Sequence, residues 1–191
     1  MNFAYKNSQR GMTLVELLIA MAILAVGMAG VLVMITSAIS TNSRNRNDST
    51  GTMLAQMVTE QITAQASTLS NNPQITDCGG TVWTISTAGA SPGPGAAGAS
   101  LITSGGNMGQ LDWNAQTYAA VAANYKMRYQ ACAPTANQRP VYEVRWNVAT
   151  NANDPTKLVT VSARQIGFAN QTALSGLMFA RPVTLRTIVG P

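Results

Sequence analysis

The chain has 191 residues, of which 46% are hydrophobic and only 10% are charged, and its formal net charge is +5. It contains no His, seven acidic residues and two Cys. This inventory removes the usual catalytic bases and metal ligands from most sites, and no Gly-rich phosphate-binding loop is followed by Lys and Ser or Thr. We therefore expect no enzyme activity, no cofactor and no metal site.

A long apolar segment begins close to the amino terminus. Residues 17–35 contain no charged, hydroxyl or amide side chain, and a helix of this length crosses about 28 Å of hydrocarbon at ~1.5 Å per residue. Residues 1–11 carry only Lys6 and Arg10 as charges, and Glu16 is the one carboxylate beside the apolar run. Because a carboxylate is costly in lipid, Glu16 is a functional candidate for which a partner is expected.

The sequence of residues 11–21, G-M-T-L-V-E-L-L-I-A-M, resembles the class III signal of type IV pilins and type II secretion pseudopilins. The resemblance implies that a prepilin peptidase and methyltransferase cleaves between Gly11 and Met12 and methylates the new amine on Met12. It implies further that Glu16 neutralises the terminal amine of a neighbouring subunit in the filament. Met12 departs from the family, which usually has Phe at this position.

Two other interpretations of the segment stay open. An ordinary secretory signal would be cleaved near residues 36–38, but the apolar run exceeds the ~7 to 15 residues of a signal core. A plain single-span anchor explains the length and the basic flank. Neither interpretation gives a purpose to Gly11 and Glu16.

Residues 20–33 and 53–62 resemble the PilV minor pilins, the type IV pilus modification proteins. Major pilins usually carry a Pro in the apolar segment, and this chain has none before Pro73. The resemblance implies a subunit that meets other minor pilins, the major pilin and an inner-membrane assembly platform. It also implies a single pass through the bacterial inner membrane with a periplasmic head, and later a place in the pilus at the cell surface. A type II secretion pseudopilin is the alternative, because the same leader and Glu would serve there.

Small residues in the apolar segment are candidates for close helix contact. Ala25 and Ala29 lie one turn apart, with Gly27 and Gly30 nearby, and small side chains let helix backbones approach in a membrane. Gly27 and Gly30 are also candidates for local unwinding on entry into a filament. The alternative is that Gly and Ala are simply common in membrane helices; membrane lipid is an expected partner in every case.

The chain order predicts four parts: a cleaved leader (1–11), a transmembrane or filament-core helix (12–39), an amphipathic helix continuing into the head (40–70) and a periplasmic globular head (71–191). In the third part, Leu54, Met57, Val58, Ile62, Ala66 and Leu69 recur at helical spacing. The sequence alone permits a break within residues 45–51, because Asn, Ser, Thr and Gly are poor helix formers.

Strand patterns follow in the head. Apolar and polar residues alternate in 125–131 and 142–148, residues 157–164 and 183–189 are rich in β-formers, and residues 151–155 predict a hairpin. Residues 87–109 are rich in Gly, Ala, Ser and Pro and predict a mobile surface loop. The predicted fold class is α+β, and the pilin resemblance implies a long N-terminal helix packed on an antiparallel sheet.

Cys78 and Cys132 are the only cysteines. We expect them to form a disulfide, because the periplasm is oxidising, and the closed loop would stabilise the head by about 4 kcal/mol in the chain-entropy model. A catalytic thiol is the rival interpretation, which the absence of His and of a C-x-x-C spacing disfavours.

A basic and aromatic strand motivates a further alternative, a DNA-binding or adhesive pilin. Lys126 and Arg128 could meet phosphates while Tyr125 and Tyr129 stack on bases. On a strand, however, these cations and rings face opposite sides. We therefore expect a half-buried strand with a solvated face, and nucleic acid is not an expected partner.

Overall fold

The structure is a computed structural model that describes residues 13–65, 72–89, 97–151, 154–169 and 181–190. The chain divides into two compact units, Met1–Ser43 and Arg44–Pro191, which we describe separately. The elements in chain order are α1 (Leu14–Ala64), β1 (Gln74–Thr76), β2 (Val82–Thr84), β3 (Lys126–Gln130), the 3₁₀ turn η1 (Ala136–Gln138), β4 (Pro140–Asn151), β5 (Asp154–Phe168) and β6 (Val183–Val189).

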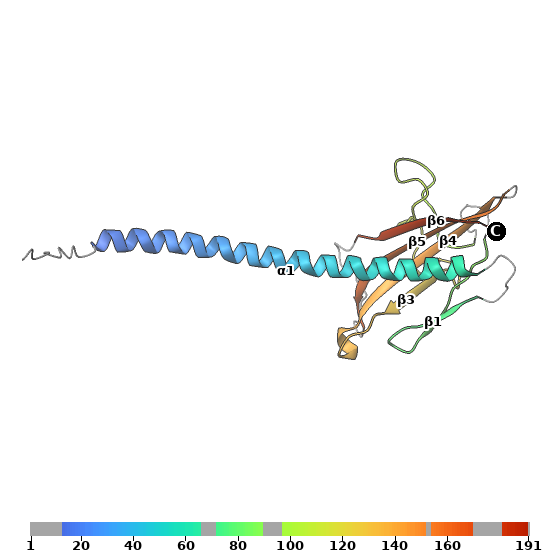
Figure 1. Ribbon diagram of the computed structural model, residues 1–191, viewed down its shortest axis with the longest axis horizontal. Coiled ribbons are helices and arrows are strands. Elements are labelled where there is room, and N and C mark those ends of the chain that lie inside the picture. The colour runs from blue at the N-terminus through green and yellow to red at the C-terminus, as the bar shows by residue number, and fades with distance from the viewer. Residues whose placement is uncertain (1–12, 66–71, 90–96, 152–153, 170–180, 191) are drawn as a thin grey trace, which may run out of the picture. The chain divides into compact units, whose positions relative to one another are not determined.

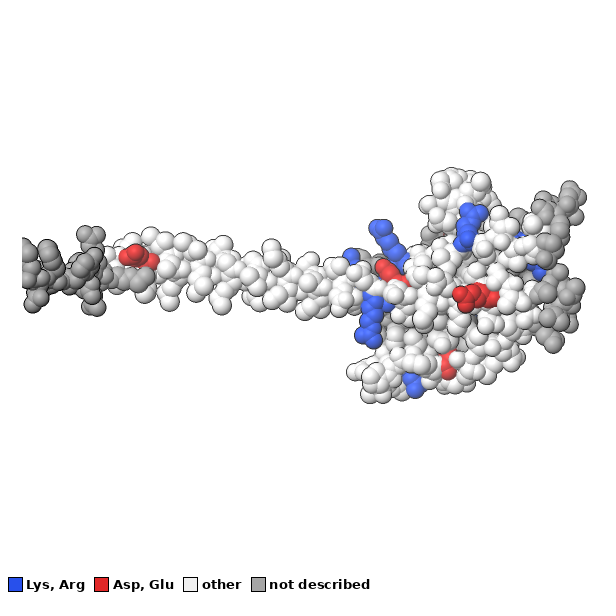
Figure 2. All heavy atoms as spheres, in the orientation of Figure 1, with Lys and Arg blue, Asp and Glu red and all other residues white. Residues whose placement is uncertain are grey.

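The first unit consists, in its described part, of the N-terminal portion of α1. All described residues up to Ser43 are exposed, including sixteen large apolar side chains between Leu14 and Ile39. Residues 17–43 carry no charge, and this stretch of helix is white in Figure 2, where only charged side chains are blue or red. This part of the helix surface is thus uncharged from residue 17 onward and predominantly apolar up to Ile39.

The second unit, hereafter the head, contains the remainder of α1 packed on a sheet (Figure 1). Leu54, Val58 and Ile62 are buried at three- and four-residue spacing, so they form one stripe of the helix. The helix runs without a break through residues 45–51. Gly51 lies in this stretch and is buried against the sheet, near Ala163 and Val183. Tertiary packing therefore outweighs the weak helix propensity of this segment.

The main sheet is antiparallel with strand order β3-β4-β5-β6. The β4–β5 hairpin falls within the predicted residues 151–155, since β4 ends at Asn151 and β5 begins at Asp154. Alternate residues of these two strands point to the α1 side and form the core; they are Tyr142, Val144, Trp146, Val148, Val159, Val161 and Ala163. The molecule has the predicted α+β layout, a long N-terminal helix packed on an antiparallel sheet.

A second, two-stranded sheet pairs β1 with β2. It lies beside the end of β3, where the Cys78 N–H donates to the carbonyl of Gln130 (3.1 Å). A disulfide joins Cys78 to Cys132, with the two Cα atoms 5.2 Å apart. Asp77 accepts hydrogen bonds from the Gly79, Thr81 and Gln130 N–H groups and from Trp83 Nε1. The small sheet is therefore fastened to the main one.

Residues 97–124 contain no helix and no named strand, but they are attached to the main sheet. Gly98 pairs with Asn147 at the edge of β4, and the Ala99 N–H donates to the Trp146 carbonyl (2.9 Å). Ala99 is buried in consequence. Residues 87–109 were predicted to form a mobile surface loop. In the described part of this loop, Ala99 is packed against the sheet, whereas Met108 is exposed. Residues 90–96 of that loop lie outside the described residues.

Candidate functional site

The first turn of α1 holds the sequence-predicted Glu16. Thr13 precedes the helix, and its Oγ1 accepts a hydrogen bond from the Glu16 N–H (3.3 Å). A Thr N-cap followed three residues later by Glu is the capping-box pattern, which satisfies donors that the first helical turn leaves free. A carboxylate here is also favoured by the positive end of the helix dipole. Glu16 therefore has a local structural role, and among the described residues its exposed carboxylate has no ion-pair partner.

Thr13 was not among the predicted site residues, although the T-x-x-E spacing is a signal that could have identified it. Gly11 and Met12, the predicted processing residues, lie outside the described residues. The structure thus places Thr13 and Glu16 together at the start of the helix, within a few residues of the expected cleavage point.

The predicted helix-packing residues occupy the apolar part of α1. Ala25, Gly27, Ala29 and Gly30 are all exposed. A Cβ built on Gly27 or Gly30 would have no atom within 4 Å outside the local helix. Both glycines keep helical structure. This surface is free to meet lipid or other helices, and α1 is long and apolar enough to cross a membrane by length and composition.

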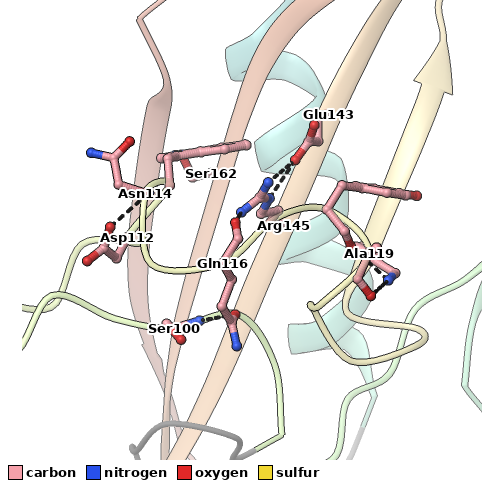
Figure 3. A network of polar contacts seen from close by, with 11 residues as sticks. Ser100, Asp112, Asn114, Gln116, Ala119, Glu143, Arg145 and Ser162 are labelled. Carbon is pink, nitrogen blue, oxygen red and sulfur yellow. Dashed lines mark hydrogen bonds and ion pairs between the residues drawn. The ribbon is translucent and has the colours of Figure 1, made fainter. Parts of the chain in front are cut away.

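On the head, the sheet face opposite α1 carries a polar cluster (Figure 3). Glu143 and Arg145 of β4 are only 3% and 2% exposed, and Arg145 Nε donates to Glu143 Oε1 (2.6 Å). Arg145 Nη1 donates to the backbone carbonyl of Gln116 (2.7 Å). The Gln116 side chain accepts the Ser100 N–H (3.0 Å). The ion pair thus holds residues 112–119, hereafter the covering loop, against the sheet.

Two rings of the covering loop lie against cations of the sheet. The guanidinium carbons of Arg145 and Arg164 are 4.5 and 4.2 Å from the ring centre of Trp113. Tyr118 meets Arg128 at 4.2 Å in the same way. Burial lowers the pKa of Arg164 and raises that of Tyr118. Such cation–ring contacts stabilise by about 0.5 to 2 kcal/mol each, so they add to the attachment of the loop.

This arrangement corrects the expectation of a solvated face on these strands. Lys126 and Arg128 do alternate with the core-side Met127 and Tyr129, as predicted. However, Lys126 Nζ donates to the carbonyls of Tyr118 and Ala119 (2.8 and 2.9 Å). The covering loop thus occupies the face that was expected to meet water. The prediction was wrong because the local strand pattern carries no sign of a distant segment folding over the strand. The sequence analysis missed Trp113 and Tyr118 for the same reason.

No group of three or more His, Cys, Asp or Glu within the described parts of the chain could hold a metal ion. In the head cluster, Glu143 is paired with Arg145, and Asp112 accepts hydrogen bonds from the Asn114 and Ala115 N–H groups. The hydrogen bond of Arg145 to Gln116 and the ring contacts of Trp113 and Tyr118 fasten the covering loop to the sheet. The cluster is therefore a structural attachment, and the chemically distinctive feature of the molecule is the capped, acidic and apolar start of α1.

Comparison with known protein families finds the prokaryotic N-terminal methylation motif at residues 6–32. The matched region contains Gly11, Met12 and Glu16 and the first half of the exposed apolar helix. No curated protein and no solved structure matches the chain. The motif supports a type IV pilin-like protein, and together with the apolar helix it is consistent with membrane anchoring and a place on the pilus surface.

Proposed function

We propose that this chain is a non-catalytic minor pilin, a subunit of a type IV pilus assembly and initiation complex. One observation carries the proposal: the methylation motif covers an apolar helix whose whole surface is exposed in the described chain. An exposed apolar surface of this length requires lipid or other apolar helices around it. A membrane and then a filament core supply these two environments in turn.

Processing comes first in this proposal. A prepilin peptidase cleaves between Gly11 and Met12 and methylates the Met12 amine. The new terminus then lies one residue before the Thr13 cap and four before Glu16. The cleaved chain therefore begins with a positive amine, a helix cap and a carboxylate in close succession.

Assembly follows through Glu16. A carboxylate in a low-dielectric environment is costly alone and much less costly beside an ammonium group. Its pairing with the terminal amine of a neighbouring subunit favours one axial register of the packed helices. Ala25, Gly27, Ala29 and Gly30 supply small surfaces at which helices can approach closely. Other minor pilins, the major pilin and the inner-membrane assembly platform are the proposed partners. The PilV minor pilins are the group that residues 20–33 and 53–62 resemble.

A pseudopilin of a type II secretion system is the second candidate, because the same N-terminal motif supports it. The DNA-binding or adhesive alternative gains less support. Tyr125 is buried, Tyr129 lies on the core side of β3, and Lys126 is hydrogen-bonded to the covering loop. The rings and cations that motivated it therefore do not form one free surface.

The variant Glu16→Gln tests the assembly role while preserving the capping box. Gln serves at this helix position as Glu does, so only the negative charge is lost. We expect normal cleavage and at least a tenfold fall in incorporation into pili, measured by immunoblot of sheared filaments, since the loss of a buried charge pair exceeds about 1.4 kcal/mol.

Thr13→Ala is the matched control, because it removes the cap and retains the carboxylate. A cap is worth about 1 kcal/mol, and we expect a smaller effect on incorporation than in Glu16→Gln. Normal incorporation of Glu16→Gln would contradict the charge-pairing role and leave capping as the function of this residue.

A further inference from the structure

Arginines gather at the end of the head where α1 enters it. Arg44 and Arg46 lie on α1, Arg139 directly precedes β4, and Arg181 precedes β6 by two residues. Figure 2 shows Lys and Arg side chains grouped at this end with one acidic patch among them. We call these four residues the arginine end.

Contacts within the head bring the three chain segments together. Tyr142, near the start of β4, is hydrogen-bonded to Thr50 and feels the charge of Arg46. Gly51 of α1 approaches Ala163 and Val183, so the start of β6 lies against the same stretch of helix. The Ala169 N–H donates to the carbonyl of Arg139 (2.8 Å). Figure 1 shows the start of β6 and the orange turn before β4 at this end of the head.

The positive charge of the arginine end is not neutralised within the described chain. No ion pair joins any of the four arginines to a described carboxylate. Asp48 is the one acid on α1 in this region. Asp77, on the neighbouring hairpin, is 5% exposed and is engaged by backbone N–H groups. Arg44, Arg46 and Arg181 are exposed. The end thus presents a net positive surface to its surroundings.

Arg44 follows the apolar segment closely along the chain. Ile39 is the last large apolar residue before it, and residues 40–43 are polar and uncharged. Five residues of helix span about 7 Å, which is close to the ~5 to 7 Å depth of one headgroup layer. Arg44 therefore lies within a Debye length, ~8 to 10 Å, of the lipid surface when the apolar segment is inserted.

We propose that the arginine end docks the head on anionic phospholipid headgroups while the chain is anchored in the membrane. This inference rests on the membrane anchoring in the proposed function. Its consequence is a head held near the bilayer before assembly, by an attraction that depends on lipid charge and on salt.

Energy transfer from tryptophan to a dansyl-labelled lipid tests this docking. All three Trp residues, Trp83, Trp113 and Trp146, belong to the head. The full chain is reconstituted in nanodiscs of phosphatidylcholine alone or with roughly one quarter phosphatidylglycerol, an anionic lipid. We expect greater transfer in the anionic discs, and loss of the difference in ~0.5 M salt, where screening is strong.

Arg181→Gln and Lys157→Gln form a matched pair that each remove one positive charge. Lys157 lies near the β4–β5 hairpin, away from the arginine end. We expect Arg181→Gln to reduce the ratio of docked to undocked heads about fivefold in anionic discs, and Lys157→Gln to leave it unchanged.

The possible failures are distinguishable. A chain that co-elutes with the discs but shows equal transfer in both lipids would overturn the docking and leave the proposed function standing. Equal effects of Arg181→Gln and Lys157→Gln would also overturn the docking. They would mean that the overall charge of the head, and not the arginine end, attracts it to the lipid. A chain that does not co-elute with the discs would overturn the membrane anchoring and the docking with it.

Discussion

Tyr142 shows how one residue joins α1 to the sheet. Its side chain is 1% exposed beneath the helix, and its hydroxyl is hydrogen-bonded to Thr50. Burial raises the pKa of this phenol above its usual value of about 10, while the Thr50 hydrogen bond and the charge of Arg46 act in the opposite direction. The neutral phenol is therefore the form that fits the folded head.

This pKa shift has a consequence for stability in alkali. Because the unfolded chain loses the Tyr142 proton at lower pH than the folded chain, the contribution is fully present below pH ~10 and is lost as the pH rises further. Burial acts in the same direction on Tyr118 and Tyr129. We expect Tyr142→Phe to reduce the fall in unfolding free energy between neutral and strongly alkaline pH, measured by urea unfolding in detergent. An unchanged fall would contradict the account.

At the scale of elements, α1 combines an apolar helix with a packed amphipathic one. Gly51 is the weakest helix former in the packed portion, yet it lies in the helix interior. A Cβ at this position would make ordinary contacts, 3.8 Å from the Ala163 carbonyl oxygen and 3.9 Å from Val183 Cγ2. The helix therefore has room for a methyl group where it crosses the sheet.

We expect Gly51→Ala to stabilise the head by about 0.5 to 1 kcal/mol, because Ala has the higher helix propensity and meets no clash. Gly109→Ala is the contrasting variant. Gly109 has φ +81°, and its added Cβ would approach Arg186 Nη2 to 2.6 Å, so we expect a loss of at least ~1 kcal/mol. Urea unfolding of both variants measures the two effects. Destabilisation by Gly51→Ala would show that the helix and sheet lie closer than described.

The sequence predicted the elements better than it predicted their surroundings. Period-two alternation identified β3 and β4 with their core-side residues, because a half-buried strand follows that rule locally, and enrichment in β-formers indicated β5 and β6. The burial of Glu143 and Arg145 was not predictable in this way. It depends on the covering loop, whose Trp113 and Tyr118 reach the strands from far along the chain. Long-range coverage leaves no signal in the alternation itself.

The motif at the amino terminus could be recognised from sequence because its residues are contiguous in the chain. Gly11, Met12 and Glu16 belong to a short continuous motif, and the match at residues 6–32 contains all three. Their roles in processing and assembly stay predictions. Thr13 lay in the same motif and was overlooked, although its hydroxyl caps the helix. A motif carried by contiguous residues can thus be recognised from sequence, whereas the attachment of the covering loop required the fold.

At the scale of the whole molecule, the two units have different physical requirements. Residues 14–39 expose an apolar surface that water cannot solvate favourably. The head has its own core, a disulfide and a buried ion pair, and it needs no membrane for its packing. A protein built in this way needs a lipid or helical environment for one unit only. In the function proposed above, this environment is first the membrane and then the filament core.

The N-terminal mass of the chain, expressed with and without a prepilin peptidase, tests the central claim most directly. We expect the peptidase to produce a chain that begins at methylated Met12, and Gly11→Asp to block this product. A mature chain that begins near Ile39 would contradict the account, because the apolar helix and Glu16 would then belong to a discarded signal.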